Sequence, residues 1–129
     1  MSLAENKKLV RQVFEQIVND QDLALADRIV SPDYIDHSAR PGSIARGPAS
    51  LRDFVARQRA AFPDAHVTVE DILGERDLVA VRIAMTGTPA VGGAPVRFRG
   101  SVWWRLADGK IVERWGGAFV REDVANPPA

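Results

Sequence analysis

The sequence contains no cysteine, and this absence excludes several kinds of site at once. Disulfide frameworks, thiolate nucleophiles and sulfur-ligated metal centres all require that residue. Histidine occurs only as His37 and His66, which do not have the short spacings that metal sites use. The chain also has no phosphate-binding glycine motif and no serine in a nucleophile elbow. We therefore expect neither a metal ion nor a cofactor.

An excess of one charge and long apolar runs are missing as well. Seventeen basic and seventeen acidic side chains cancel, so no overall field attracts nucleic acid or an anionic membrane. No apolar stretch is long enough to span a bilayer, and the start of the chain lacks the pattern of a signal peptide. These absences predict a cytoplasmic protein with no nucleic-acid or membrane partner.

The residues that are present suffice for one hydrophobic core. A length of 129 residues with 46% hydrophobic side chains is typical of one domain. We expect a single domain over residues 1–129, with its core at about 6–121 and a disordered tail at 126–129. Apolar residues recur first with helical and then with strand periodicity. The expected helices are 6–19, 23–30 and 48–62, and the expected strands are 33–38, 66–72, 78–86, 96–106 and 111–120.

This order of elements predicts an α+β fold. Three N-terminal helices would pack on one face of a strongly curved, mostly antiparallel sheet. A tight turn at 108–109 would pair Leu106 with Ile111, and by alternation Trp104 with Glu113 and Val102 with Trp115. A bulge in this hairpin would shift the register and exchange some positions between the faces.

In that register Glu113 lies among apolar residues on the face that the helices cover. Desolvation there would favour its protonated form, so Glu113 is a candidate proton carrier. The alternative is a structural ion pair with an arginine such as Arg82. The opposite face combines several arginines, including Arg105 and Arg114, with the large aromatic Trp103. A large aromatic side chain on a charged sheet face indicates that another protein surface buries it. We therefore predict a homodimer with this face at the interface.

His37 is the second candidate for catalysis. It ends the strand 33–38 immediately before a glycine-containing loop, and histidine changes its charge near neutral pH. Asp36 precedes it, although neighbours on a strand point to opposite faces unless the strand ends or twists there. The alternative is an ordinary surface histidine at a strand end.

Several segments carry a family resemblance. They are 31–37 (SPDYIDH), 47–52 (GPASLR) with 60–64 (AAFPD), and 105–115 (RLADGKIVERW). Together, over about Leu9 to Phe119, they resemble the SnoaL-like polyketide cyclases of the nuclear transport factor two-like superfamily. The resemblance implies a cone of three helices against the curved sheet, with an internal ligand cavity and commonly a dimer.

The resemblance also implies cofactor-free acid–base chemistry on a hydrophobic, carbonyl-like small molecule. Aldol cyclisation, isomerisation and hydration all occur in related cones. His37 falls where the related ketosteroid isomerase has its base, which makes His37, Asp36 and Glu113 the candidate catalytic residues. The candidate substrate-binding residues are Phe14, Tyr34, Phe54, Arg82, Val102, Trp104 and Trp115.

The chain also departs from its relatives. Phe14 and Val102 stand where the isomerase has its oxyanion-binding tyrosine and acid. Gly116 and Gly117 stand where the cyclases tend to have an acidic residue, and the stretch 88–95 is shorter than the usual lid. A non-catalytic module that binds a hydrophobic ligand, or a dimerisation module of the same fold, is therefore an alternative to an enzyme.

Overall fold

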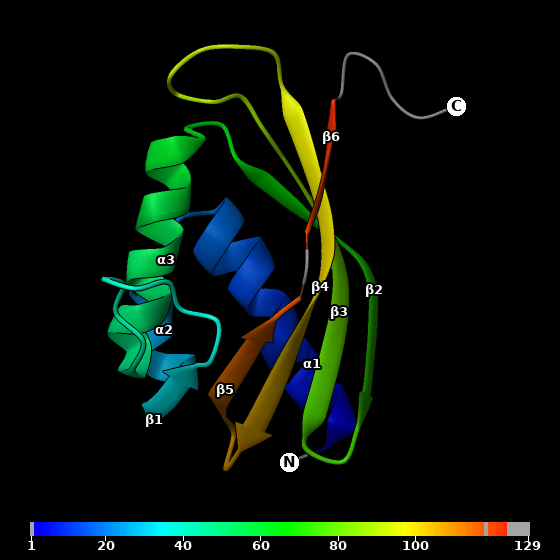
Figure 1. Cartoon of the computed structure of the whole chain (residues 1–129). Helices are drawn as coiled ribbons and strands as arrows, with labels where there is room; N and C mark the ends of the chain where they lie inside the picture. Colours follow the sequence, from blue (N-terminus) through cyan, green and yellow to red (C-terminus); the bar gives the residue numbers. More distant parts are fainter. Residues whose placement is uncertain (1, 118, 124–129) are drawn as a thin grey trace.

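The protein is described by a computed structural model that covers residues 2–117 and 119–123. The tail 126–129, predicted to be disordered, lies outside the described residues. Helical segments come first and most strands follow, as expected (Figure 1). The elements are α1 (Leu3–Gln12), η1 (Val13–Asn19), α2 (Leu25–Ile29), β1 (Val30–Asp36), α3 (Gly47–Ala61), β2 (His66–Glu75), β3 (Leu78–Gly87), β4 (Val96–Ala107), β5 (Lys110–Gly116) and β6 (Val120–Asp123).

The helices begin and end where local chemistry requires it. Ser2 and Glu5 form a capping box that satisfies the free N–H groups at the start of α1. This helix continues without a break into η1, which is wound as a π-helix and buries four apolar side chains, those of Val13, Phe14, Ile17 and Val18. Pro48 lies in the first turn of α3, where its missing N–H costs nothing. The three predicted helical regions are confirmed.

The sheet is mixed and curled, and it does not close into a barrel. Its strand order is β1-β5-β4-β3-β2, with β6 paired to β4 beyond this path. Only the contact of β1 with β5 is parallel, so the prediction of a mostly antiparallel sheet is confirmed. The helices lie together on the concave side of the sheet (Figure 1). The fold is therefore α+β, and its shape is the expected open cone.

A bulge in β5 overturns the predicted hairpin register. The turn at 108–109 forms as predicted, and Leu106 pairs with Ile111. The next pair, however, joins Arg105 to Glu113, so Val112 is an extra residue on β5. From this point every side chain of β5 faces the side opposite to the one predicted. Trp104 consequently pairs with Arg114 rather than with Glu113.

The last predicted strand, 111–120, is in fact two strands. β5 ends at Gly116 and β6 begins at Val120, and both pair with β4 along the same edge. Phe119 approaches Gly100 so closely that a Cβ atom there would lie 2.5 Å from the ring. A residue with a side chain at position 100 would displace that ring, which explains the glycine.

The core fills most of the space between the helices and the concave face. Trp104, Tyr34, Ile17 and Ile111 are the largest side chains that are fully buried. None of the described helices combines the length and apolar character needed to cross a membrane.

Candidate active site

A cavity of about 620 Å³ remains open between the helices and the concave face of the sheet. Its walls come mainly from η1 and α3 on one side and from β3, β4 and β5 on the other. Most of the lining is apolar, which is typical of small-molecule sites. The apolar lining residues include Val13, Phe14, Val18, Leu51, Phe54, Phe62, Ile83, Met85, Phe98, Val102 and Trp104.

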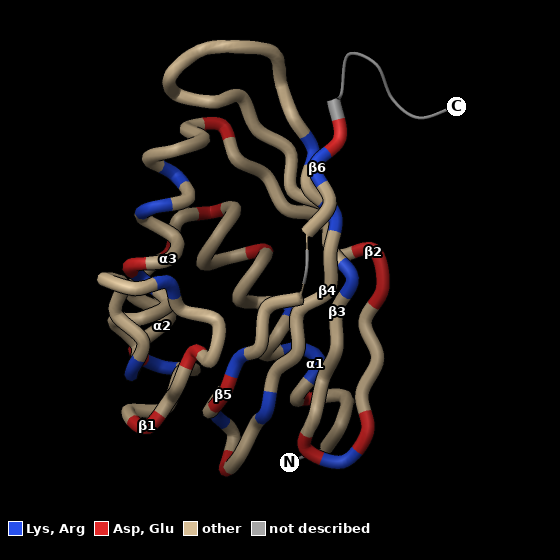
Figure 2. The backbone as a smooth tube through the Cα atoms, in the orientation of Figure 1, with Lys and Arg blue, Asp and Glu red and all other residues tan. Residues whose placement is uncertain are grey.

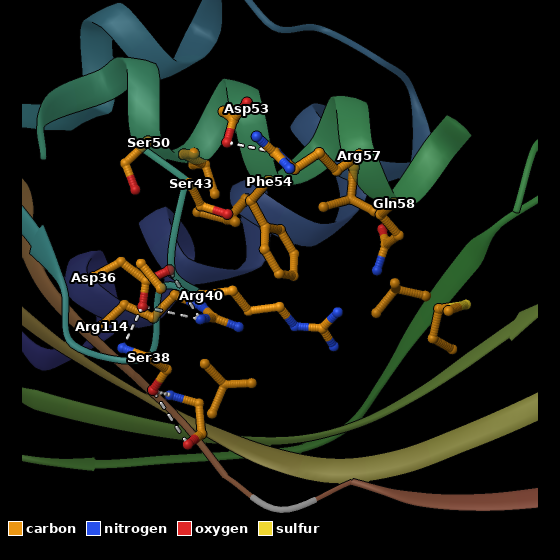
Figure 3. Close-up of a pocket in the computed structure, with 18 of the residues that line it drawn as sticks. Asp36, Ser38, Arg40, Ser43, Ser50, Asp53, Phe54, Arg57, Gln58 and Arg114 are labelled. Carbon is orange, nitrogen blue, oxygen red and sulfur yellow. Dashed lines mark hydrogen bonds and ion pairs between the residues drawn. The ribbon is translucent and has the colours of Figure 1, made fainter. Parts of the chain in front are cut away.

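A buried ion pair lies in this apolar wall. Asp36 at the end of β1 and Arg114 on β5 are register partners, so both side chains project to the same side of the sheet. Arg114 Nη1 donates to both carboxylate oxygens of Asp36, at 3.2 Å each (Figure 3). The side chains are only 5% and 8% exposed. The pair therefore places two opposite charges on a surface that is otherwise suited to an apolar ligand.

Arg114 is held between two aromatic rings. Its guanidinium carbon lies 4.8 Å from the ring centre of Phe54 and 5.7 Å from that of Trp104. Cation–π attraction and the ion pair both restrain this side chain. Beyond the bonds to Asp36, its N–H groups make no hydrogen bond to any described residue. Arg114 can therefore offer further donors to a ligand.

Two hydrogen bonds of Ser38 fix the backbone next to the ion pair of Asp36 and Arg114. The backbone N–H of Ser38 donates to Asp36 at 2.9 Å, and Ser38 Oγ accepts from the N–H of Gly116 at 2.7 Å. These bonds tie the loop that follows β1 to the end of β5. They hold Asp36 and Arg114 in one arrangement.

The structure places His37 and Glu113 outside the cavity, which corrects two predictions. His37 Nε2 lies 2.7 Å from Glu113 Oε2, and the imidazole stacks on Trp115 with ring centres 5.0 Å apart. Glu113 also pairs with Arg105 at 3.0 Å. The cause is the bulge in β5, which turns Glu113 and Trp115 to the convex face. The two predicted catalytic residues do meet, but on the other side of the sheet from Asp36.

Arg82 is also on the convex face, where it forms an ion pair with Asp71. Neither Arg82 nor Trp115 lines the cavity, which corrects the expected placement of both side chains. Charges of both signs alternate along β5, as Figure 2 shows. This alternation reflects the two faces of the strand, with Arg114 inside and Glu113 outside.

The remaining predicted binding residues divide into two groups. Phe14, Phe54, Val102 and Trp104 line the cavity. Tyr34 lies deeper, in the packed core, and only 1% of its surface is exposed. Burial raises the pKa of the Tyr34 hydroxyl, and the nearby negative charge of Asp36 adds to this effect.

Sequence reasoning missed the arginines of the cavity. Arg114 was assigned to the convex face because the bulge was not recognised, and Arg40 was hidden in a loop whose direction has no periodic signal. The sequence signal that could have drawn attention to Arg114 is its position shortly before the glycine pair Gly116–Gly117. Over the described ranges, no three His, Asp or Glu side chains gather closely enough to hold a metal ion.

The family model of the SnoaL-like polyketide cyclases matches residues 8–118. The chain belongs to this family. A comparison with curated proteins found no significant match. The SnoaL-like chain is, however, similar to many solved structures over nearly all of its length.

Two of these structures share more than a quarter of their residues with this SnoaL-like protein. AclR, a proposed hydroxylase from Streptomyces galilaeus, is 28% identical with a TM-score of 0.74, over 95% of this chain and 82% of that one. IdmH, a proposed polyketide cyclase from Streptomyces antibioticus, is 26% identical with a TM-score of 0.73, over 91% of both chains. A polyketide cyclase-like protein of Bacillus cereus is 23% identical with a TM-score of 0.78, over 92% and 74%. The family and the fold therefore support a small-molecule enzyme type of architecture.

Proposed function

We propose that this SnoaL-like protein is a cofactor-free enzyme that removes a proton next to a carbonyl group of a largely apolar small molecule. The observation that carries the proposal is the ion pair of Asp36 and Arg114 in the wall of the cavity. A charged acid–base residue beside a restrained cation, within an apolar pocket, matches the needs of enolate chemistry. Asp36 is the base, and Arg114 binds the carbonyl oxygen.

The proton transfer follows from the positions of these two groups. A carbonyl oxygen that accepts from a free N–H of Arg114 brings its neighbouring carbon close to Asp36. The C–H bond breaks, its proton goes to Asp36, and its electron pair becomes the enolate, whose negative oxygen remains on Arg114. The cation that orients Asp36 also stabilises the enolate that forms as the proton leaves carbon.

The next step distinguishes the possible reactions. In an aldol cyclisation the enolate carbon attacks a second carbonyl of the same molecule, forms the ring bond and leaves an alkoxide that takes the proton from Asp36. In an isomerisation the proton returns to another carbon. Both sequences conserve atoms and electrons, so neither requires an oxidant or a cofactor.

The structure also supports a role for Asp36 in place of the missing cyclase acid. A Cβ atom at Gly116 would lie 3.4 Å from Arg114 Nη1, so an acidic residue there would reach the same guanidinium. In this chain the partner carboxylate comes from β1 instead.

Exchange of the hydrogen next to the carbonyl of a model ketone tests the proposal without knowledge of the natural substrate. Benzylacetone, a small apolar ketone, is incubated with the protein in D₂O, and deuterium next to the carbonyl is followed by NMR. The native protein should accelerate exchange beyond buffer alone. Asp36→Asn should lower that acceleration by about 100-fold or more, which is the usual contribution of a positioned base.

Two matched variants separate this assignment from the alternatives. Asp33→Asn removes an exposed carboxylate from the same strand, and His37→Gln removes the predicted histidine base; both should keep exchange within a few-fold of native. Full activity of Asp36→Asn would refute the proposal. Loss of activity in His37→Gln alone would restore the histidine as base.

A second function, binding of a hydrophobic ligand without catalysis, is favoured by one observation. Asp36 already accepts hydrogen bonds from Arg114 and from the Ser38 backbone, so its role can be purely structural. If benzylacetone binds but shows no accelerated exchange with the native protein, this second function is the correct one.

A further inference from the structure

The cavity contains one more positive charge than negative charge. Its charged lining residues are Asp36, Arg40, Asp53, Arg57 and Arg114. Arg114 is paired with Asp36, and Arg57 Nε lies 3.0 Å from Asp53 Oδ2. Arg40 makes no side-chain hydrogen bond or ion pair within residues 2–117 and 119–123. One guanidinium is therefore left without a counter-charge.

The free guanidinium points into the cavity. Arg40 belongs to the loop that joins β1 to α3, and its side chain extends beneath the ring of Phe54, away from the Asp36 and Arg114 pair (Figure 3). Its backbone is fixed by a turn in which the N–H of Ser43 donates to the Arg40 carbonyl at 3.0 Å. The direction of the side chain thus follows from a defined turn at its base.

A second polar group faces the same region. Gln58 on α3 also lines the cavity, and its amide points into the same cavity as the Arg40 guanidinium (Figure 3). Across the described residues, the side chain of Gln58 has no hydrogen-bond partner. Arg40, which is exposed, and Gln58, which is half-buried, together offer N–H donors to a cavity whose lining is mainly apolar. A ligand that enters the cavity displaces water from these donors and has to supply acceptors in its place.

We infer that the cavity takes an apolar molecule with a single carboxylate group, which Arg40 and Gln58 bind. An arginine fork matches a carboxylate in geometry and can donate two parallel N–H bonds to it. One unpaired cation balances one negative charge. A phosphate monoester carries nearly two at neutral pH and would leave a charge uncompensated, because Arg57 and Arg114 already have carboxylate partners.

This inference rests on the proposed function in one respect: the carboxylate-bearing molecule is taken to be the substrate whose carbonyl lies on Arg114. Its acid group would then occupy the Arg40 side of the cavity while the reacting carbon lies beside Asp36. A substrate that is bound at both ends has its reacting carbon held in one orientation, and such orientation contributes strongly to catalysis.

Binding of two matched probes tests the inference without any need for turnover. Naphthoate and its neutral amide naphthamide have nearly the same shape, and their affinities are measured by isothermal titration calorimetry. The native protein should bind naphthoate about tenfold to a hundredfold more tightly than naphthamide, as expected for a charged hydrogen-bonded pair. Naphthyl phosphate should bind more weakly than naphthoate.

Substitution of Arg40 should remove this preference. In Arg40→Met the two affinities should become equal within a few-fold, and naphthamide should bind as it does to the native protein. Arg46→Met removes an exposed arginine from the same loop and should keep the native preference. This control has the same net charge, so it accounts for any long-range electrostatic effect.

The outcomes separate the two proposals. A native preference for naphthoate that is lost only in Arg40→Met supports the carboxylate site, even if deuterium exchange fails and the proposed function is wrong. Equal affinities for naphthoate and naphthamide in the native protein overturn the carboxylate site, whatever the exchange assay shows. Tighter binding of naphthyl phosphate than of naphthoate also overturns it.

Discussion

Arg114→Met should destabilise the fold far more than the loss of an ordinary surface arginine. The substitution leaves Asp36 buried without its cation, and the removal of one partner of a buried pair costs about 3–5 kcal/mol. The pair borders an open cavity, which water can enter, so we expect a value near the lower limit, about 3 kcal/mol. With a slope of about 1.5 kcal/mol per molar urea, the unfolding midpoint should fall by about 2 M.

A double-mutant cycle shows whether the loss belongs to the pair. Asp36→Asn combined with Arg114→Met removes both charges, and the double variant should recover most of the stability lost in Arg114→Met. Arg11→Met breaks an exposed pair between Arg11 on α1 and Glu15 on η1 and should cost less than about 0.5 kcal/mol. Urea unfolding is followed by tryptophan fluorescence for the four proteins of the cycle and for Arg11→Met.

Two results would refute this reasoning. If Arg114→Met costs no more than Arg11→Met, the pair is not a buried electrostatic unit. If the losses of the two single variants at Asp36 and Arg114 simply add in the double variant, the two residues do not interact energetically. Either result would also remove the physical basis for a base and a cation that act together.

Two further predictions concern other parts of the fold. Tyr34 is the only tyrosine, so absorbance near 295 nm reports it alone, and its raised pKa means that the folded state keeps the proton. Stability should therefore decline as the pH rises above about 10, and ionisation should coincide with unfolding; a reversible titration near pH 10 with intact circular dichroism would contradict this. Gly117→Ala should destabilise the protein by about 1–3 kcal/mol in thermal unfolding, because the new Cβ would lie 2.5 Å from the Ser101 carbonyl oxygen. Gly116→Ala has 3.4 Å available and should be nearly neutral, so equal effects of the two substitutions would disprove the steric argument.

Periodicity was sufficient to predict the fold but not the site. Apolar spacing identified the helices and most strands, because burial of one face imposes a period that local sequence records. The turn at 108–109 was also predictable, since Asp-Gly adopts the left-handed conformations that it requires. The bulge at Val112 was not, because an extra residue in one strand is decided by how the strand packs and twists over its neighbours.

That single residue accounts for most of the errors about the site. Glu113 and Trp115 were predicted to face the cavity, and Arg114 was predicted to face away from it. The structure reverses all three. His37 lies on the convex face with them, where it stacks on Trp115 and pairs with Glu113. The convex face does carry Trp103, about half exposed, and the homodimer that would cover it stays a prediction.

The bulge has a consequence for how this site can change over evolutionary time. The extra residue keeps Glu113 opposite Arg105 and Arg114 opposite Trp104. If Val112 joined the ladder as an ordinary residue opposite Arg105, every following side chain of β5 would change faces. Glu113 would then point toward the ligand and Arg114 toward the convex side, without any substitution in β5. Two relatives that differ only in this bulge can therefore present a different acid or base to the substrate although their residues align.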